Sequence, residues 1–173
     1  MNPDECIRTP RLCLRPLVPG DRDAVTDLLT DAAVAQTYML PVFAAREEAY
    51  PLFARLCALS ADPARFVRGI EHNGTVIGLI NDVEMTGGTV ELGYALLPAH
   101  WNNGYAAEAL AAAVQALFAR GFSAVRAGAF EENAASLRVM EKAGLARIPH
   151  TDTVEYRGKT HRCVYGEITR PAD

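Results

Sequence analysis

One stretch of the chain decides its fold: Thr89-Val-Glu-Leu-Gly-Tyr-Ala-Leu-Leu-Pro98-Ala-His-Trp-Asn-Asn-Gly104-Tyr-Ala-Ala-Glu-Ala109. Its first part alternates in character, which is typical of a strand with two different faces. One predicted face carries Val90, Leu92, Tyr94 and Leu96, and the other carries Glu91, Gly93 and Ala95. Pro98 ends this strand because proline has no N–H group to donate to a neighbouring strand.

A helix is predicted after the two asparagines and Gly104. Apolar side chains at i, i+4, i+7 and i+8 give it one buried face, made of Leu110, Val114, Leu117 and Phe118. The first N–H groups of a helix lack partners within the helix and carry partial positive charge, so this turn favours an anion, usually phosphate. Gly104 would let a phosphate approach the backbone closely. The same pattern also fits an ordinary strand–turn–helix joint capped by asparagine.

At these residues the chain resembles a known family. The segment from Pro98 to Ala109 looks like the acetyl-CoA-binding motif of the GNAT superfamily of N-acetyltransferases, Gln/Arg-x-x-Gly-x-Gly/Ala, with Gly104 as its glycine. Trp101 departs from the general motif but is usual in the Rim-type branch, whose founders acetylate the N-termini of ribosomal proteins. The resemblance implies that acetyl-CoA is the cosubstrate and that its phosphates lie at Asn102, Asn103, Gly104, Tyr105, Ala106 and Ala107.

Two further segments extend the resemblance over nearly the whole chain. Rim-type proteins begin with a segment similar to Thr9-Pro-Arg-Leu-Cys-Leu-Arg15. The segment from Asn133 to Leu145 resembles the family pattern Asn-x-x-Ser/Ala followed by Glu-Lys-x-Gly-Phe/Leu, and Asn133 and Gly144 are good caps for the two ends of a helix.

The predicted elements alternate in a way that indicates an α+β fold and one domain over residues 1–173. A strand near residues 12–16 and two helices come first, and a β-hairpin follows whose turn is Asn73-Gly74. The Glu91 strand, its helix, a strand over residues 124–130, a helix and a terminal hairpin complete the order. We therefore expect a mixed central sheet of about seven strands with helices on both faces.

The resemblance also implies a split in that sheet. The Glu91 strand and the Ala124 strand would lie parallel and splay apart, and Gly93 would form a bulge that opens them. The pantetheine arm of acetyl-CoA would enter this opening and pair with backbone groups near Leu96 and Leu97. Asn133 would bond to the same arm as well as cap its helix.

Acetyl transfer to an amine requires a neutral amine and hydrogen-bond donors for the thioester oxygen. The departing thiolate can also take a proton from a general acid. Glu91 is the expected general base, since many family members carry a glutamate here. A glutamate that is only solvated, or that only binds a cationic substrate, is the alternative. The expected oxyanion donors are backbone N–H groups after Gly93. No nucleophile pair is suggested by the motifs, which favours direct transfer.

The sequence departs from the family pattern at the position of the general acid. A tyrosine often follows the asparagine by seven residues, but Met140 stands there and cannot donate a proton. Ser136 is the substitute that we expect, as in some Rim-type enzymes. The alternative is a serine hydroxyl that only bonds to its own helix.

Composition restricts the remaining possibilities. The net charge of −4 argues against nucleic acid as a main partner. No apolar run is long enough to span a membrane, and the N-terminus lacks a secretory h-region, so cytoplasmic location is expected. The four cysteines show no pairing or zinc spacing, so we expect them to be reduced and structural, and we expect no metal.

The sequence does not identify the amine that accepts the acetyl group. A protein N-terminus follows from the Rim-type resemblance, whereas a small amine such as an aminoglycoside or a polyamine is the alternative. A non-catalytic acyl-CoA-binding module and a transfer-RNA acetyltransferase are further alternatives, and the second would need a basic face that the composition does not offer. Residues 31–44 are rich in apolar side chains, and they form either a loop packed on the core or a wall of the acceptor pocket.

Overall fold

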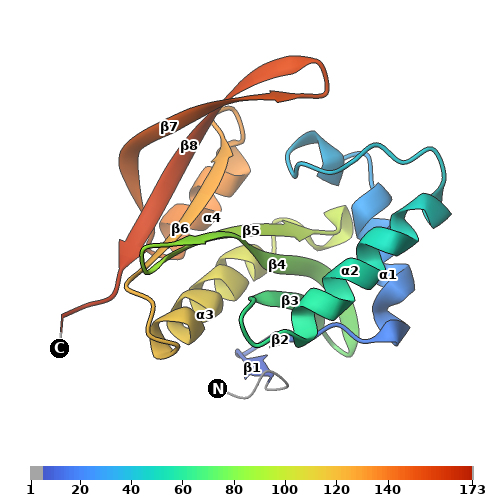
Figure 1. Ribbon diagram of the computed structural model, residues 1–173, viewed down its shortest axis with the longest axis horizontal. Helices are drawn as coiled ribbons and strands as arrows, with labels where there is room; N and C mark the ends of the chain where they lie inside the picture. Colours follow the sequence, from blue (N-terminus) through green and yellow to red (C-terminus); the bar gives the residue numbers. More distant parts are fainter. Residues whose placement is uncertain (1–5, 173) are drawn as a thin grey trace.

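The computed structural model of the protein describes residues 6–172, and these form an α+β fold around one eight-stranded sheet (Figure 1). The strand order is β1-β2-β3-β4-β5-β6-β8-β7, and β5 and β6 are the one parallel pair among these strands. The predicted mixed sheet is confirmed, with β1 as a short strand beyond the expected seven. The strands are β1 (Ile7–Arg8), β2 (Cys13–Arg15), β3 (Val67–His72), β4 (Thr75–Thr86), β5 (Thr89–Leu96), β6 (Ala124–Phe130), β7 (Ala146–Tyr156) and β8 (Lys159–Thr169).

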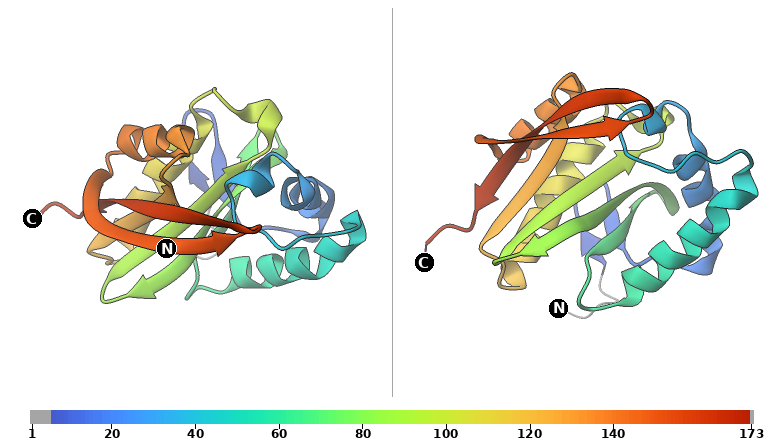
Figure 2. Two further views of the ribbon diagram at one scale, coloured as in Figure 1. Left: turned by 90° about the horizontal axis from the view of Figure 1, so that it is seen from above. Right: turned by 45° about the horizontal axis from the view of Figure 1, so that its top comes forward.

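Helices cover both faces of the sheet, as predicted (Figures 1 and 2). The helices α3 (Tyr105–Ala119) and α4 (Ala134–Lys142) pack on one face. The helices α1 (Arg22–Thr30) and α2 (Tyr50–Ala61) pack on the other. Because successive side chains of a strand point to opposite faces, β5 contributes to both cores, with Leu92 in the first and Ala95 in the second.

The turns on either side of β4 adopt the backbone that their sequences favour. Asn73 and Gly74 join β3 to β4 with φ angles of 50° and 80°. Gly87 and Gly88 join β4 to β5 with φ angles of 59° and 83°. Positive φ at both central residues suits the twist of a two-residue hairpin, and glycine and asparagine tolerate it best.

The predicted bulge at Gly93 is wrong. The register between β4 and β5 shifts between Asp82 and Glu84, so the extra residue is Val83 of β4, and Gly93 pairs regularly with Asn81. Gly93 serves close packing instead: a Cβ atom there would lie 3.3 Å from Val83 Cγ2 and 3.4 Å from Tyr38 Cε2. A glycine that lets another group approach the backbone and a glycine in a bulge look the same in sequence.

The predicted splay between β5 and β6 is confirmed. Their parallel pairing runs from Thr89 opposite Ala124 to Leu92 opposite Ala127, and it ends there although both strands continue. β6 goes on pairing with β8 as far as Phe130 opposite Cys163. β6 therefore follows β8 away from β5, which opens the sheet in its middle (Figure 1).

The terminal hairpin is longer than predicted and reaches across the molecule to the loop after α1 (Figure 2). Near its tip, the Tyr156 hydroxyl donates a hydrogen bond to the Ala35 carbonyl at 2.7 Å and accepts one from the Leu40 N–H at 3.2 Å. Arg157 Nε also donates to the Tyr156 hydroxyl at 2.9 Å. These bonds join the β7–β8 hairpin to a segment more than a hundred residues earlier in the chain.

The expectation of four reduced cysteines is wrong for two of them. Cys6 and Cys13 form a disulfide, with their Cα atoms 5.8 Å apart. Antiparallel pairing of β1 with β2 brings the two residues within the range that a disulfide spans. Cys57 and Cys163 are free thiols, and burial raises the pKa of each. Among residues 6–172, no helix is long and apolar enough to cross a membrane.

Candidate active site

A cavity of about 490 Å³ lies at the opening between β5 and β6. Its walls come from the turn before α3, the start of α3, the end of β5, α4, the second half of β6 and the loop after α1. The structure brings together eight of the predicted site residues there: Leu96, Asn102, Gly104, Tyr105, Ala106, Ala107, Asn133 and Ser136. Leu97, Asn103 and Glu91 do not line it.

The turn before α3 has the backbone that an anion site requires. Gly104 is the N-cap of α3 with φ of 79°, and Asn102 has φ of 60°. The first hydrogen bond of this helix runs from the Glu108 N–H to the Gly104 carbonyl at 3.1 Å. The N–H groups of Tyr105, Ala106 and Ala107 precede that bond, so the helix itself offers them no acceptor.

Two residues of the opening segment hold this turn, which the sequence reasoning missed. Arg11 contacts Glu108 through Nε at 2.7 Å and through its backbone N–H at 3.0 Å, and Thr9 Oγ1 donates to Glu108 at 2.6 Å. Arg11 also donates to the Asn103 carbonyl at 2.8 Å. Asn103 is therefore fixed as part of the turn and not as a wall of the cavity. The Thr-x-Arg segment of the family resemblance was the available signal.

The end of β5 presents its backbone to the opening, but Leu97 does not. The Leu97 N–H donates to the Ile77 carbonyl at 2.9 Å, and the Leu97 carbonyl accepts from His100 at 2.9 Å. Both groups are used by the fold, so pairing of the pantetheine arm with Leu97 is not supported. Since backbone groups alternate in direction along a strand, the N–H groups of Tyr94 and Leu96 point toward β6 beyond its last pair with β5. The Leu96 carbonyl accepts from the Trp101 indole at 2.7 Å.

One face of α4 forms the opposite wall. Asn133 caps this helix by accepting from the Ser136 N–H at 3.2 Å. The lining positions Ala135, Arg138, Val139 and Lys142 follow the i, i+3, i+4, i+7 spacing of one helical face. Within the described chain, Arg138 and Lys142 make no ion pair, so two cations border the cavity. The helical spacing of these positions is the signal that the sequence contains for them.

Ser136 faces a second hydroxyl that the sequence reasoning did not consider. The Tyr94 hydroxyl lies 2.8 Å from Ser136 Oγ and 3.2 Å from the Ser136 carbonyl, and both residues line the cavity. Burial raises the pKa of Tyr94 to about 12. Met140, at the position where the family often has a tyrosine, is buried in the core between the sheet and the helices α3 and α4.

Glu91 lies on the other side of β5 from Leu92 and Tyr94. It pairs in register with Arg126 of β6 and Glu84 of β4, and it is half-buried. Burial raises the pKa of Glu91, and the charge of Arg126 opposes that rise. Arg126 itself binds Glu167 at 2.8 Å.

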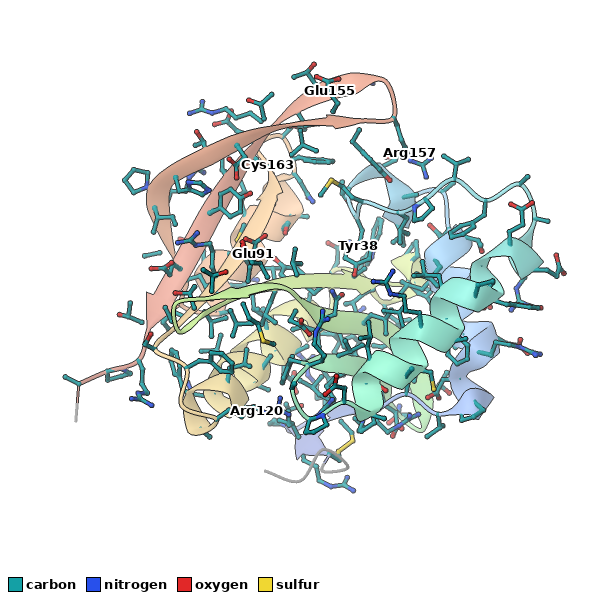
Figure 3. The ribbon with its side chains drawn as sticks, viewed as in Figure 1. Tyr38, Glu91, Arg120, Glu155, Arg157 and Cys163 are labelled. Carbon is teal, nitrogen blue, oxygen red and sulfur yellow. A yellow bond between two sulfur atoms is a disulfide. The ribbon has the colours of Figure 1, made fainter. Side chains whose placement is uncertain are left out.

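The cavity reaches this side of β5 at Gly93. Tyr38 and Gly93 both line it, and Gly93 shares the strand face of Glu91 two positions earlier. The Tyr38 hydroxyl donates to Asn81 Oδ1 at 2.5 Å. Figure 3 shows Glu91 and Tyr38 on the side of β5 that faces the β7–β8 hairpin.

The loop of residues 31–44 has both of the roles that we considered, since part of it packs on the core and part of it lines the cavity. Val34 and Leu40 are buried in the core, yet the cavity is also lined by Val34, Gln36, Thr37 and Tyr38. Met39 and Val42 are exposed. In the part of the chain that the structure describes, no three His, Cys, Asp or Glu side chains gather as a metal-binding group.

Known proteins share this sequence pattern and architecture. A family model of the acetyltransferase (GNAT) domain matches residues 11–146. The uncharacterized N-acetyltransferase YoaA of Bacillus subtilis (strain 168) is 30% identical over 146 residues, which cover 82% of each chain.

Solved structures of other acetyltransferases share this fold. A GNAT-family acetyltransferase from Bacillus anthracis has a TM-score of 0.82 at 23% identity, covering 95% of this chain and 98% of its own. RimL, a ribosomal L7/L12 α-N-protein acetyltransferase in complex with coenzyme A, has a TM-score of 0.84 at 20% identity, covering 98% and 100%. With the family match over more than half of its length, this chain belongs to the GNAT family and is an N-acetyltransferase.

Proposed function

We propose that this enzyme transfers an acetyl group from acetyl-CoA directly to an α-amine at the N-terminus of a peptide or protein. One observation carries the proposal: a single cavity runs from the N-terminus of α3, past Tyr94 and Ser136, to Gly93 on the strand face of Glu91. It thus runs from the start of α3, through the opening of the sheet, to the face of β5 that carries Glu91 two positions before Gly93.

The charge of the cavity walls supports this cavity as the site of acetyl-CoA. The pyrophosphate accepts hydrogen bonds from the N–H groups at the start of α3. The pantetheine arm runs along the end of β5, next to the N–H groups of Tyr94 and Leu96, with Asn133 on its other side. Arg138 and Lys142 face the remaining phosphate of the cofactor with their positive charges.

The transfer uses Glu91 as the base. Because Glu91 does not line the cavity, it takes the ammonium proton through a water molecule. Its raised pKa favours this role, since a stronger base holds the proton better. The neutral amine then attacks the thioester carbon, backbone N–H groups after Gly93 hold the oxyanion, and the Ser136 hydroxyl faces the departing sulfur.

The acceptor follows from a difference in pKa. At a pH of about 7.5, neutralising a lysine side chain of pKa about 10.4 costs about 4 kcal/mol, whereas an α-amine of pKa about 7.7–8.0 costs less than about 1 kcal/mol. A single glutamate acting through water suits the amine that is already partly neutral. RimL, an α-N-protein acetyltransferase of similar fold, supports the same choice.

A small amine of lowered pKa, such as an amino sugar, is the second candidate. It satisfies the same pKa argument. The hydrogen bonds of Tyr156 to the loop after α1 favour it, because they hold the tip of the hairpin against a loop that also lines the cavity, and a small acceptor needs less room there than a peptide.

The test measures release of the CoA thiol from acetyl-CoA with three acceptors. One peptide has a free α-amine and a blocked lysine, a second has the reverse, and an aminoglycoside is the third. We expect the first peptide to have the highest kcat/KM near pH 7.5. Preference for the lysine peptide would refute the pKa argument, and preference for the aminoglycoside would select the second candidate.

A further inference from the structure

Two hydroxyl groups from distant parts of the chain meet on the wall of the cavity. Tyr94 belongs to β5 and Ser136 to α4, 42 positions later, and their oxygen atoms lie 2.8 Å apart. Asn133 fixes the Ser136 backbone through the cap of α4. The aromatic ring of Tyr94 packs against the core between the sheet and the helices α3 and α4. Both hydroxyls are thus held by the fold before any ligand binds.

The hydrogen atoms of this pair can be arranged in two ways. The Tyr94 hydroxyl can donate to the Ser136 carbonyl at 3.2 Å, which leaves Ser136 Oγ to donate to Tyr94. Alternatively, Tyr94 donates to Ser136 Oγ, and the Ser136 hydrogen is then free to point into the cavity. Between Cys6 and Ala172, the Ser136 hydroxyl makes no hydrogen bond other than the one to Tyr94, so nothing in that part of the chain competes for the freed hydrogen.

We propose that Tyr94 is a positioning residue for acetyl transfer: it donates to Ser136 Oγ, and this directs the Ser136 hydroxyl hydrogen at the departing sulfur of coenzyme A. A hydroxyl that accepts one hydrogen bond also becomes a better donor of the next, so the pair binds the developing thiolate more strongly than a lone serine would. The inference rests on the proposed function, in which acetyl-CoA lies in this cavity.

The pair acts by hydrogen bonding and not by giving up a proton. The C–N bond forms as the C–S bond breaks, the electron pair of the C–S bond goes to sulfur, and the amine proton leaves through Glu91. A thiol has a pKa of about 8.5, more than three units below that of Tyr94, so proton transfer from Tyr94 to the thiolate is unfavourable by more than about a thousandfold. The thiolate departs with its charge and takes a proton from water after release.

Other charges near the pair act on the same sulfur. Arg138 and Lys142 of α4 border the cavity and favour the thiolate. Glu91, which points to the opposite face of β5 from Tyr94, disfavours it. They remain in place when either hydroxyl is removed. A change in the thiol pKa between wild type and hydroxyl variants therefore reports on the pair alone.

The test is the pKa of the thiol of bound coenzyme A, followed by the ultraviolet absorbance of the thiolate, with desulfo-CoA as the blank. We expect Tyr94→Phe and Ser136→Ala each to raise this pKa by about one unit, or tenfold in the ionisation constant, and the double variant to raise it no further than Ser136→Ala. Tyr50→Phe, which removes a hydroxyl from α2 on the other face of the sheet, is the matched control and should leave it unchanged.

The outcomes separate this inference from the proposed function. If the enzyme binds coenzyme A but Tyr94→Phe leaves the thiol pKa at the wild-type value, the positioning role is refuted while the cofactor site stands. Additive shifts in the double variant would also refute it, because they would mean that the hydroxyls act independently. If the wild type does not bind coenzyme A, the proposed function fails first. In steady-state assays, Tyr94→Phe should lower kcat by about tenfold without changing KM for acetyl-CoA by more than about threefold.

Discussion

A carboxylate placed in the first turn of α3 should weaken binding of coenzyme A strongly while leaving the fold intact. Ala106 lines the cavity at the second residue of this helix, and its small side chain leaves the N–H groups of the turn accessible. In Ala106→Asp, a unit charge would lie about 4 Å from the proposed pyrophosphate. At an effective dielectric constant of about 20, one such pair repels by roughly 4 kcal/mol, and solvent screening at the exposed turn reduces this to about 2–4 kcal/mol.

The same substitution favours the helix itself. An aspartate in a first turn stabilises a helix by about 0.3–1 kcal/mol, so the variant should keep or raise its Tm. Calorimetric titration should show a Kd for coenzyme A about 30 to 1000 times higher, with the loss shrinking as salt is added. Gln115→Glu is the control: it adds the same charge nine residues further along α3, about 14 Å away and beyond the Debye length. A Kd for Ala106→Asp within about threefold of wild type would show that the phosphates lie elsewhere.

Three further variants test the base, the support of the turn and the packing at the cavity. Glu91→Gln should lower kcat by about a hundredfold or more with unchanged affinity for acetyl-CoA, and it should abolish the acid limb of the pH profile. Because burial raises the pKa of Glu91, wild-type activity should fall at a higher pH than for an ordinary glutamate as the solution is acidified, so a limb kept in the variant would exclude Glu91 as its source. Arg11→Met should raise the Kd of coenzyme A several-fold and cost about 1 kcal/mol or less in unfolding free energy, whereas Arg46→Met, which removes another exposed ion pair, should leave the Kd unchanged. Gly93→Ala should lower the unfolding free energy by about 1–3 kcal/mol, because its Cβ would press on Val83 and Tyr38, and equal denaturant midpoints for variant and wild type would contradict that packing.

Local features of the chain were predictable because they depend on the residue alone. Gly104 and Asn73-Gly74 adopt positive φ, which few other residues tolerate, so their turns could be placed from the sequence. The alternation of β5 correctly separated the face of Leu92 from the face of Glu91. The opening between β5 and β6 depends on residues far apart in the sequence, which periodicity cannot relate. The resemblance to GNAT proteins predicted it.

Features that depend on a distant partner were not predictable in this way. Val83 carries the bulge because of how β4 pairs with β5, and no turn residue marks it. Tyr94 read as one more apolar position of a strand, although its hydroxyl meets Ser136 of α4. The contact of Arg11 with Glu108 joins positions 97 residues apart, and single charged residues carry no information about their partners.

The placement of the proposed base and of the proposed hydrogen-bond donor to sulfur follows from the geometry of one strand. Glu91 and Tyr94 lie an odd number of positions apart on β5, so their side chains point to opposite faces of the sheet. In the proposed transfer, the amine loses its proton on the face of Glu91 and the thiolate departs on the face of Tyr94 and Ser136. Gly93, which lines the cavity from the face of Glu91, has no side chain to close the passage between them. A substitution that fills this passage should therefore hinder transfer more than it hinders binding of coenzyme A, whose proposed phosphate site is at the start of α3.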